Sequence, residues 1–442
     1  MALDTVEIPP AGEPAKFTQF GPNYTCHAHR ALFPCVAMKI RAFQGLRPDP
    51  EQAASVASLP YDVVNTAEAR ALAEGNPKSF LHVVRAEIDF PEGTDMYSDP
   101  VYTKAKENLD ALQSSGALVR EEAASLYVYQ QIMDGHKQQG LVSVCHIEDY
   151  LNDLIKKHEK TRPQKEDDRT KLNATLSAHP GPVFLTYRDD ASINAKIEQI
   201  TGTDPLIDFT APDGVEHTVW RVADTESLVE AFANVPASYV ADGHHRSASA
   251  ARVGAERKAA NPDHTGDEDY NWFLAVNFPA SQLKILPYNR LVFDLNGQSD
   301  EEFLEKVKAV ATITEDVDPS PDQVGKLSMY FNHRWYGLEF AADDTLDPVS
   351  RLDISRLQDG ILGPILGIDD PRTSNRIDFI GGIRGTEELE KRVHQGDGPV
   401  AFSMYPVTIE QLMDIADAGA TMPPKSTWFE PKLRSGLFVH TI

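Results

Sequence analysis

The feature that most constrains the fold is a short apolar run that leads directly into a polar turn. Residues 237–241 read Ala-Ser-Tyr-Val-Ala, and Asp242-Gly243-His244-His245-Arg246 follows at once. The apolar run predicts a strand, and the residues from Arg246 predict a helix that ends at Gly254. A buried strand that passes through a tight turn into a helix is the building unit of sheets covered by helices. We therefore expect a mixed α/β fold.

The rest of the chain repeats this alternation. Strands are predicted at about 36–43, 79–86, 182–187, 218–222, 273–278 and 283–292, and a β-hairpin is predicted over 125–147. Helices are predicted over 68–74, 101–116, 191–200 and 225–234. After the turn at Asn296-Gly297 come a helix at 300–311, strands at 327–331, 334–340, 378–382 and 400–404, and a helix at 408–418.

A chain of 442 residues is too long for one simple core. We expect a loosely ordered segment over residues 1–35, which contains five prolines, and an N-terminal α/β part over residues 36–148. The core over 149–295 carries the polar turn, and a C-terminal α/β part follows over 296–442.

The charge of the chain restricts its partners. Lys and Arg number 42 against 67 Asp and Glu, a formal net charge of −25. Such a surface repels nucleic acid and anionic membranes, so we predict a small-molecule substrate and neither of those partners. An anionic substrate must then be collected by a local positive site. The oligomeric state stays open.

Cysteine usage and the N-terminus indicate the compartment. Cys26, Cys35 and Cys145 form no CxxC pair, which favours a reducing environment. The first residues lack the basic and apolar regions of a signal peptide, and no apolar stretch is long enough to cross a bilayer. We therefore expect a soluble, cytoplasmic protein.

The turn at residues 242–246 is the strongest candidate for chemistry. A helix that begins there leaves backbone N–H groups free to bind an anion, and Gly243 allows close approach. His244, His245 and Arg246 could hold a phosphate or an oxyanion, and Asp242 could bind Mg²⁺ or orient an imidazole. In the alternative interpretation the histidines only cap the helix. Five polar or flexible residues directly after an apolar strand favour the functional interpretation.

Two further polar stretches are weaker candidates. His158-Glu159-Lys160-Thr161 begins a charged run that extends through Arg169, and Pro163 shows that the run is not one helix. Glu159 could be a general base, although most such carboxylates only face solvent. Lys425-Ser426-Thr427 and Lys432 near the end lack the glycine loop of a Walker A motif, so either a phosphate-binding role or a structural clasp is possible.

Other hydrolase signatures are absent from the sequence. There is no HExxH motif and no GxSxG motif.

A family resemblance rests on four of these stretches together. The boxes are Ala241-Asp-Gly-His-His-Arg246, Lys157-His-Glu-Lys-Thr161, Pro60-Tyr61-Asp62-Val63 and Met422-Pro-Pro-Lys-Ser-Thr-Trp-Phe-Glu-Pro-Lys432. From about residue 36 onward the chain resembles a large prokaryotic family named as a domain of unknown function. The His-Glu and Asp-Gly-His-His-Arg boxes are also similar, more distantly, to those of the ParB/sulfiredoxin-like free-serine kinases, which implies a ParB/sulfiredoxin-like core.

The resemblance to the free-serine kinases also implies roles for individual residues. Glu159 would deprotonate the hydroxyl of free L-serine or a similar small alcohol, and Asp242 would bind Mg²⁺ directly or through water. The transferring phosphoryl group would be held by His244, His245 and Arg246. Other predicted phosphate or substrate contacts are His158, Lys160, Thr161, Arg169 and Gly243. The Lys-rich ending has no counterpart in those kinases. Independently of the resemblance, we predict that Lys425, Ser426, Thr427 and Lys432 contact a phosphoryl donor, which could be pyrophosphate or an adenine nucleotide.

Two other functions remain possible at this stage. The same turn would serve a phosphoester hydrolase in which a histidine or a metal-bound water is the nucleophile. A ParB-like nucleotide-binding regulator is the third interpretation, although the net charge of −25 argues against DNA as its partner. The sequence leaves the donor and the acceptor open.

Overall fold

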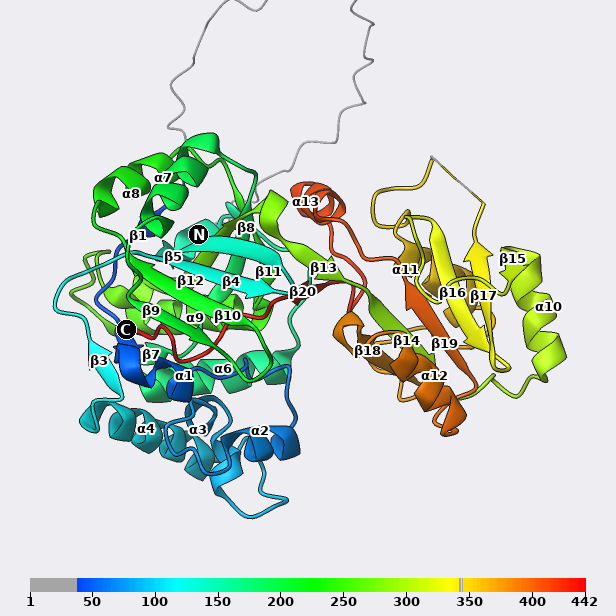
Figure 1. Ribbon diagram of the computed structural model, residues 1–442, viewed down its shortest axis with the longest axis horizontal. Coiled ribbons are helices and arrows are strands. Elements are labelled where there is room, and N and C mark those ends of the chain that lie inside the picture. The colour runs from blue at the N-terminus through cyan, green and yellow to red at the C-terminus, as the bar shows by residue number, and fades with distance from the viewer. Residues whose placement is uncertain (1–37, 342, 344) are drawn as a thin grey trace, which may run out of the picture. The chain divides into compact units, whose positions relative to one another are not determined.

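The computed structural model describes residues 38–341, 343 and 345–442 of the chain. The predicted loose segment over 1–35 lies outside these residues, together with Cys26 and Cys35. Helices and strands alternate through the described part (Figure 1), and the predicted mixed α/β class is confirmed. None of the helices in this part is long and apolar enough to cross a membrane.

A nine-stranded sheet carries the polar turn. Its strands run in the order β6-β11-β8-β12-β5-β4-β10-β9, and β1 pairs with β5. The pairs β11–β6 and β12–β8 are parallel, whereas the other pairs are antiparallel. The strands are β1 (Ile40–Arg41), β4 (Tyr127–Met133), β5 (His136–His146), β6 (Ile155–Lys156), β8 (Val183–Tyr187), β9 (Ile207–Thr210), β10 (Glu216–Arg221), β11 (Ser238–Asp242) and β12 (Trp272–Pro279).

Both faces of this sheet are buried. In β11, Tyr239 and Ala241 belong to one apolar cluster, whereas Val240 between them belongs to another. Successive side chains of a strand point to opposite faces, so a strand covered on both sides is apolar throughout. This is why residues 239–241 show three successive apolar side chains and not an alternating pattern.

Helices cover the sheet and bring two loops together. The helices in this region are α5 (Ile147–Leu151), α6 (Pro163–Leu176), α7 (Ala191–Thr201), α8 (Thr225–Phe232), α9 (His244–Ala260) and the 3₁₀ turns Asp269–Asn271 and Ala280–Gln282. Helices α6 and α9 pack against each other. Pro163 occupies the first turn of α6, where its missing N–H is no loss.

The predicted end of the helix at Gly254 is wrong, because α9 continues to Ala260. A Cβ atom at Gly254 would lie 2.5 Å from the carbonyl oxygen of Tyr270. The glycine therefore allows a neighbouring backbone to approach the helix, and it does not end it.

A small helical layer precedes the hairpin. It contains β2 (Leu46–Pro48), the 3₁₀ turns Pro50–Gln52 and Ala86–Asp89, α1 (Ala53–Val56), α2 (Thr66–Ala73), α3 (Leu81–Val84), α4 (Asp99–Ser114) and β3 (Leu118–Arg120). The strand predicted at 79–86 is wrong, because these residues form α3 and the turn after it. Leu81, Val83 and Val84 pack in one apolar cluster with Leu109 and Leu112 of α4. Periodicity alone does not separate so short an apolar run in a helix from a buried strand.

A second sheet of six antiparallel strands follows, in the order β15-β17-β16-β19-β14-β18. Its strands are β14 (Tyr288–Val292), β15 (Thr312–Glu315), β16 (Lys326–Phe331), β17 (Arg334–Glu339), β18 (Ile377–Gly381) and β19 (Val400–Met404). Its helices are α10 (Asp300–Val310), α11 (Asp353–Leu357), the π-helical turn Gln358–Leu362, the 3₁₀ turn Gly382–Arg384, α12 (Glu387–His394) and α13 (Ile409–Asp417). The helices predicted at 300–311 and 408–418 agree with α10 and α13.

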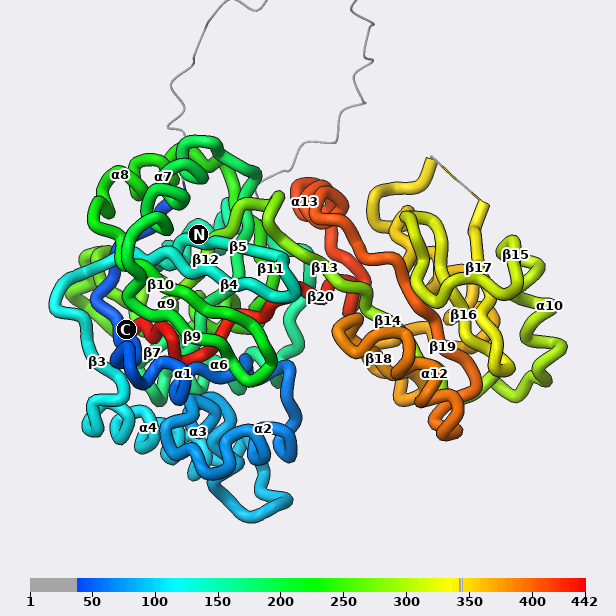
Figure 2. The backbone as a smooth tube through the Cα atoms, viewed as in Figure 1, coloured from blue at the N-terminus to red at the C-terminus, as the bar shows by residue number. Residues whose placement is uncertain are grey.

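After α13 the chain returns to the nine-stranded sheet, as the red end of the trace in Figure 2 shows. Strand β20 (Trp428–Glu430) pairs with β13 (Lys284–Leu286), and β21 (His440–Thr441) pairs with β7 (Ala178–His179). We call residues 422–434 the C-terminal strap.

The sheet takes strands from both sides of the predicted boundary at residues 148/149. That boundary therefore does not separate two sheets. The division of the chain into parts stays a prediction.

Candidate functional site

The polar turn forms at the end of β11, as the sequence predicted. The strand ends at Asp242, and α9 begins at His244. Gly243 between them has a φ of 97°, in the left-handed region that favours glycine. A Cβ atom at this position would lie 2.9 Å from Nε of Arg246. The glycine therefore permits both the turn and the close approach of the guanidinium to the backbone.

Asp242 is held between two cations. Its Oδ2 accepts a hydrogen bond of 2.8 Å from Nζ of Lys432, and its Oδ1 lies 3.5 Å from Nη2 of Arg246. Burial alone would raise the pKa of Asp242, but the Lys432 ammonium and the Arg246 guanidinium hold it well below its usual range. Asp242 is therefore ionised across the physiological range and fixes the strap to the turn.

The two histidines of the turn have different surroundings. The ring of His244 packs edge-on against the ring of His158, with 4.5 Å between their centroids, and both side chains are buried. Burial lowers the pKa of His158 to about 4, and burial together with that neighbouring ring lowers the pKa of His244. Nε2 of His245 accepts a hydrogen bond of 3.0 Å from the backbone N–H of Arg162, the N-cap residue of α6. Burial lowers the pKa of His245 as well. The three imidazoles are therefore neutral at pH 7.

Glu159 lies in the loop between β6 and α6, beside the turn. Its side chain is 38% exposed, and Oε2 lies 3.9 Å from Nδ1 of His244. Burial raises the pKa of Glu159, against the opposing effect of the Lys425 ammonium. A carboxylate with a raised pKa at the edge of a cleft is suited to accept a proton.

The C-terminal strap reaches the same place through long-range contacts. The N–H of Met422 donates to the carbonyl oxygen of His158 at 2.7 Å. The buried guanidinium of Arg290 donates to the carbonyl oxygen of Lys425 at 3.0 Å and to that of Tyr288. These contacts hold the Lys425 ammonium 5.2 Å from the centre of the Tyr288 ring. Its pKa is raised although burial opposes the charge, because Tyr288 and Glu159 lie close to it.

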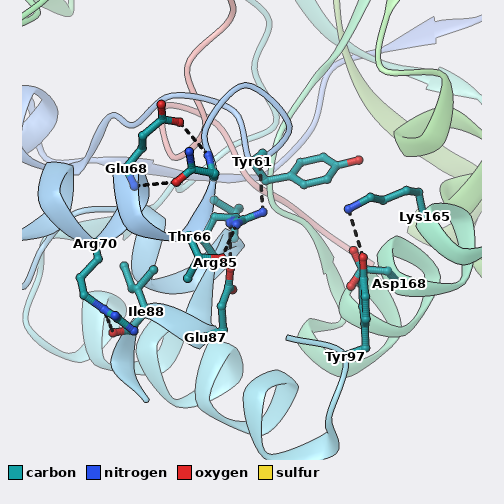
Figure 3. Close-up of polar contacts among 12 residues, drawn as sticks. Tyr61, Thr66, Glu68, Arg70, Arg85, Glu87, Ile88, Tyr97, Lys165 and Asp168 are labelled. Carbon is teal, nitrogen blue, oxygen red and sulfur yellow. Dashed lines mark hydrogen bonds and ion pairs between the residues drawn. The ribbon is translucent and has the colours of Figure 1, made fainter. Parts of the chain in front are cut away.

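A third group of residues comes from the N-terminal helical layer. Arg85 is buried; its Nη2 donates to Oγ1 of Thr66 at 2.9 Å and its Nη1 to the carbonyl oxygen of Tyr61 at 3.4 Å (Figure 3). Glu87 forms an ion pair with it at 2.9 Å. These contacts fix the backbone of Tyr61 and, with it, the position of Asp62.

Together these segments enclose a cleft of about 310 Å³. This volume is at the lower end of the range for small-molecule sites. Its charged lining consists of the cations Arg85, Arg162, Lys165, Lys425 and Lys432 and the carboxylates Asp62, Glu159 and Asp242. Its other polar and aromatic lining includes Tyr61, Gly243, His244, His245, Tyr288, Thr427 and Trp428. Cations thus outnumber carboxylates in the cleft, although the net charge of the chain is −25. A local positive site of this kind is what the sequence analysis predicted for an anionic substrate.

Some predicted site residues lie outside this lining. Lys160 is exposed, and the hydroxyl of Thr161 donates to Glu166. Ser426 donates to the carbonyl oxygen of Pro423.

Arg169 and Arg246 are committed to contacts behind the cleft. Arg169 is buried, donates to Asp168 at 2.7 Å and stacks on the ring of Tyr61. Arg246 donates to the carbonyl oxygen of Pro182 in addition to Asp242. The roles proposed for Lys160, Thr161, Ser426, Arg169 and Arg246 stay predictions. In this structure Arg169 packs on Tyr61 and Arg246 contacts Asp242, so these two arginines support residues that line the cleft.

Several residues that line the cleft could not be named as site residues from the sequence, because no motif around them pointed to chemistry. Tyr61 and Asp62 lie in a box that belongs to the family resemblance, and Lys165 lies in the charged run after Glu159. Arg85 and Tyr288 have no local motif, because only the packing of distant elements brings them to the cleft.

Direct binding of Mg²⁺ by Asp242 does not fit this arrangement. Both oxygens of Asp242 already face protein cations, Lys432 and Arg246, which an ion would have to displace. Mg²⁺ also prefers a shell of oxygen ligands, whereas the other groups next to Asp242 on the turn are imidazoles.

A model of the family described as "Protein of unknown function (DUF1015)" matches residues 40–355. The chain belongs to this family. The match covers the nine-stranded sheet and the polar turn, so the cleft is built largely from the part of the chain that DUF1015 describes. A search of curated proteins gives no significant match.

Solved structures with a distant likeness to this DUF1015 member include a free serine kinase in complex with AMP. It is 12% identical with a TM-score of 0.33, and the likeness covers 63% of this chain and 84% of that one. A conserved hypothetical protein from Pyrococcus furiosus is 13% identical with a TM-score of 0.33, over 64% and 90% of the two chains. SbnI from Staphylococcus aureus, with a C-terminal truncation, is 11% identical with a TM-score of 0.35, over 65% and 82%.

Proposed function

We propose that this protein is a small-molecule kinase that transfers a phosphoryl group to the hydroxyl of free L-serine or a similar small alcohol. One observation carries the proposal. A carboxylate with a raised pKa, Glu159, shares a small cleft with an excess of cations and with the N-terminus of α9. Phosphoryl transfer to an alcohol needs a base for the hydroxyl proton and positive charge for the phosphates.

In the proposed reaction, Glu159 takes the proton of the acceptor hydroxyl. The hydroxyl oxygen then forms a bond to the terminal phosphorus of the donor, and the bond from that phosphorus to the bridging oxygen breaks. The leaving group departs with the electron pair of that bond, as inorganic phosphate if the donor is pyrophosphate. If the donor is ATP or ADP, the leaving group is ADP or AMP.

The cations of the cleft stabilise the charge that develops during transfer. Lys425 and Lys432 come from the strap, and Arg162 and Lys165 from the start of α6. The free N–H groups of the first turn of α9 add a fixed partial positive charge. Removal of one such donor from a preorganised site typically lowers kcat by about 10²–10³-fold.

The size of the cleft favours small reactants. Its volume of about 310 Å³ suits a small acceptor and a short donor. We therefore rank pyrophosphate before ATP and ADP as the donor. Tyr288 and Trp428 in the lining are the surfaces on which an adenine ring would stack if the donor is a nucleotide.

The experiment incubates the purified protein with L-serine and Mg²⁺ and, separately, with pyrophosphate, ADP or ATP. O-phosphoserine is then measured by mass spectrometry. We expect product with one donor and a loss of about 10²–10⁴-fold in Glu159→Gln. Glu256→Gln on the exposed face of α9 is the matched control and should keep full activity. Release of phosphate from phosphoserine or nucleotide, without transfer, would instead assign the cleft to a hydrolase.

The pH dependence tests the role of Glu159 separately. A base must be ionised, and burial raises the pKa of Glu159 above its ordinary value of about 4.3. We expect kcat/KM to fall about tenfold per pH unit below that raised pKa and to reach a plateau above it. A profile that stays flat to below pH 4 would remove Glu159 from the role of base.

A further inference from the structure

Two histidines beside the cleft have ring nitrogens with no partner. His158 is 1% exposed and His244 is 5% exposed. Three of their ring nitrogens have no hydrogen-bond partner within the described part of the chain: Nδ1 and Nε2 of His158, and Nε2 of His244. Buried polar groups are nearly always bonded, so these nitrogens call for a ligand that is not part of the chain.

Glu159 completes a compact set of donors with these two rings. One ligand atom from each of His158, Glu159 and His244 can be chosen so that all three lie within 4.8 Å of one another. Two of them come from the loop after β6 and the third from the first residue of α9. Both supports are anchored, because the strap bonds the backbone of His158 and α9 packs against α6.

We propose that His158, Glu159 and His244 bind a first-row transition-metal ion such as Zn²⁺. Two imidazoles and one carboxylate are the ligands that such ions prefer over Mg²⁺. Ligand atoms about 2.1 Å from an ion lie about 3.4 Å apart in a tetrahedron, so small side-chain rotations close the set around it. Glu159 and His244 line the cleft, so the remaining coordination position faces the substrate.

The site has a consequence for catalysis, which rests on the proposed function. A metal ion on the carboxylate of Glu159 takes the lone pair that would accept the hydroxyl proton. Bound Zn²⁺ therefore inhibits phosphoryl transfer, and a chelator restores it. The turnover of the kinase would then respond to the free concentration of the metal ion.

Metal binding is measured first, without reference to activity. The full-length protein is treated with a chelator and titrated with Co²⁺ while visible absorption is recorded. We expect one equivalent per chain with the intense bands of a four-coordinate site, which Zn²⁺ then displaces. No binding by the wild-type protein, as expected if a buried water satisfies the imidazoles instead, would overturn the proposal.

Variants locate the site. His158→Asn and Glu159→Gln should each weaken Co²⁺ binding by about 100-fold or more, since even outer-shell partners are worth 10–100-fold. Glu159 is partly exposed, so its variant tests the site even if His158→Asn fails to fold. His264→Asn removes a histidine that bonds Tyr270 outside the cleft and should bind Co²⁺ as the wild type does. Unchanged binding in Glu159→Gln would overturn the assignment.

The inhibitory effect has its own readout. In the phosphoserine assay, Zn²⁺ at the concentration that saturates the site should lower the rate at least tenfold, and a chelator should reverse the loss. Zinc that binds without lowering the rate would overturn the inhibition. If no donor supports transfer at all, the Co²⁺ titration still decides whether the metal site exists, so failure of the kinase proposal and failure of the metal proposal are distinguishable.

Discussion

The turn at residues 242–246 and the C-terminal strap line the same cleft, but they are held by different kinds of contact. The turn is fixed locally, by the left-handed Gly243 and by a strand and a helix that adjoin in the chain. The strap is anchored to the rest of the chain by partners far away in sequence, such as His158, Arg290 and Asp242. Mutations in the turn should therefore change the local backbone conformation beside Asp242. Mutations in the strap should instead break the long-range contacts that hold Lys425 and Lys432 at the cleft.

The largest effect is expected where the two regions meet, at Asp242 and Lys432. These side chains are 23% and 10% exposed. Asp242→Asn removes the carboxylate that binds the mostly buried Lys432 ammonium, and Lys432→Met leaves the carboxylate of Asp242 only the longer contact with Arg246. Each change should lower stability by about 3 kcal/mol and kcat/KM by about 10²–10³-fold. Urea unfolding and the phosphoserine assay measure the two effects.

The double variant of Asp242 and Lys432 sharpens this test. It should be less damaged than the sum of the single variants, with a coupling of about 2 kcal/mol in urea unfolding. The same cycle on the exposed pair Arg188 and Asp417 should give less than about 1 kcal/mol. Additive effects at Asp242 and Lys432 would mean that the strap does not depend on the turn.

A smaller effect is expected for Gly243→Ala. A side chain at this positive φ costs about 1–2 kcal/mol, and the new Cβ would also lie 2.9 Å from Arg246. The displacement of Arg246 and of the start of α9 should lower kcat/KM about 10²-fold.

Gly214→Ala is the matched control for Gly243→Ala. Gly214 has a φ of 82° and no atom within 4 Å of an added Cβ. The Gly214→Ala variant should lose about as much free energy of unfolding as Gly243→Ala but keep full activity. Equal activity in the two variants would show that the position of Arg246 does not matter for transfer.

The smallest effect is expected at Arg290, which bonds the strap at Lys425 and the start of β14 at Tyr288. Arg290→Met removes the hydrogen bonds to the carbonyl oxygens of Lys425 and Tyr288. Freed from these bonds, Lys425 should bind the donor about fivefold more weakly, since one hydrogen bond is worth about 1 kcal/mol.

Separate measurements of KM and kcat distinguish a role of Arg290 in positioning Lys425 from a purely structural role. We expect a higher KM for the donor with kcat within about twofold, and partial recovery in Arg290→Lys. A lower kcat with unchanged KM would contradict the role of Arg290 as a positioning residue for Lys425.

Local features of the fold followed from the sequence, and long-range ones did not. The hairpin at 125–147, the strand over 237–241 and the turn after it agree with β4, β5, β11 and α9, because each depends on neighbouring residues. The order of the nine strands depends instead on contacts between residues tens to more than a hundred positions apart, such as those of β11 with β8 and of β5 with β12. No local pattern encodes that order.

The residues of the candidate site show the same difference between local and long-range features. Glu159, Asp242, His244 and His245 could be named from two short boxes, and all four line the cleft. Arg85 is a buried arginine whose neighbours in the sequence are apolar or ordinary helix residues, and Tyr288 begins a strand of the other sheet. Only the folded chain places them beside Glu159. Gly254 was misread for a similar reason, since its function is to accommodate a distant backbone.

The position of the strap in the chain has a consequence for the order of synthesis. The ribosome releases the polar turn about 180 residues before it releases residues 422–434, and domains begin to fold during translation. A nascent chain can therefore form β11 and α9 while Lys425 and Lys432 are still in the exit tunnel. Until they emerge, Asp242 has only Arg246 as a partner, and the growing polypeptide has no complete cleft in which to react.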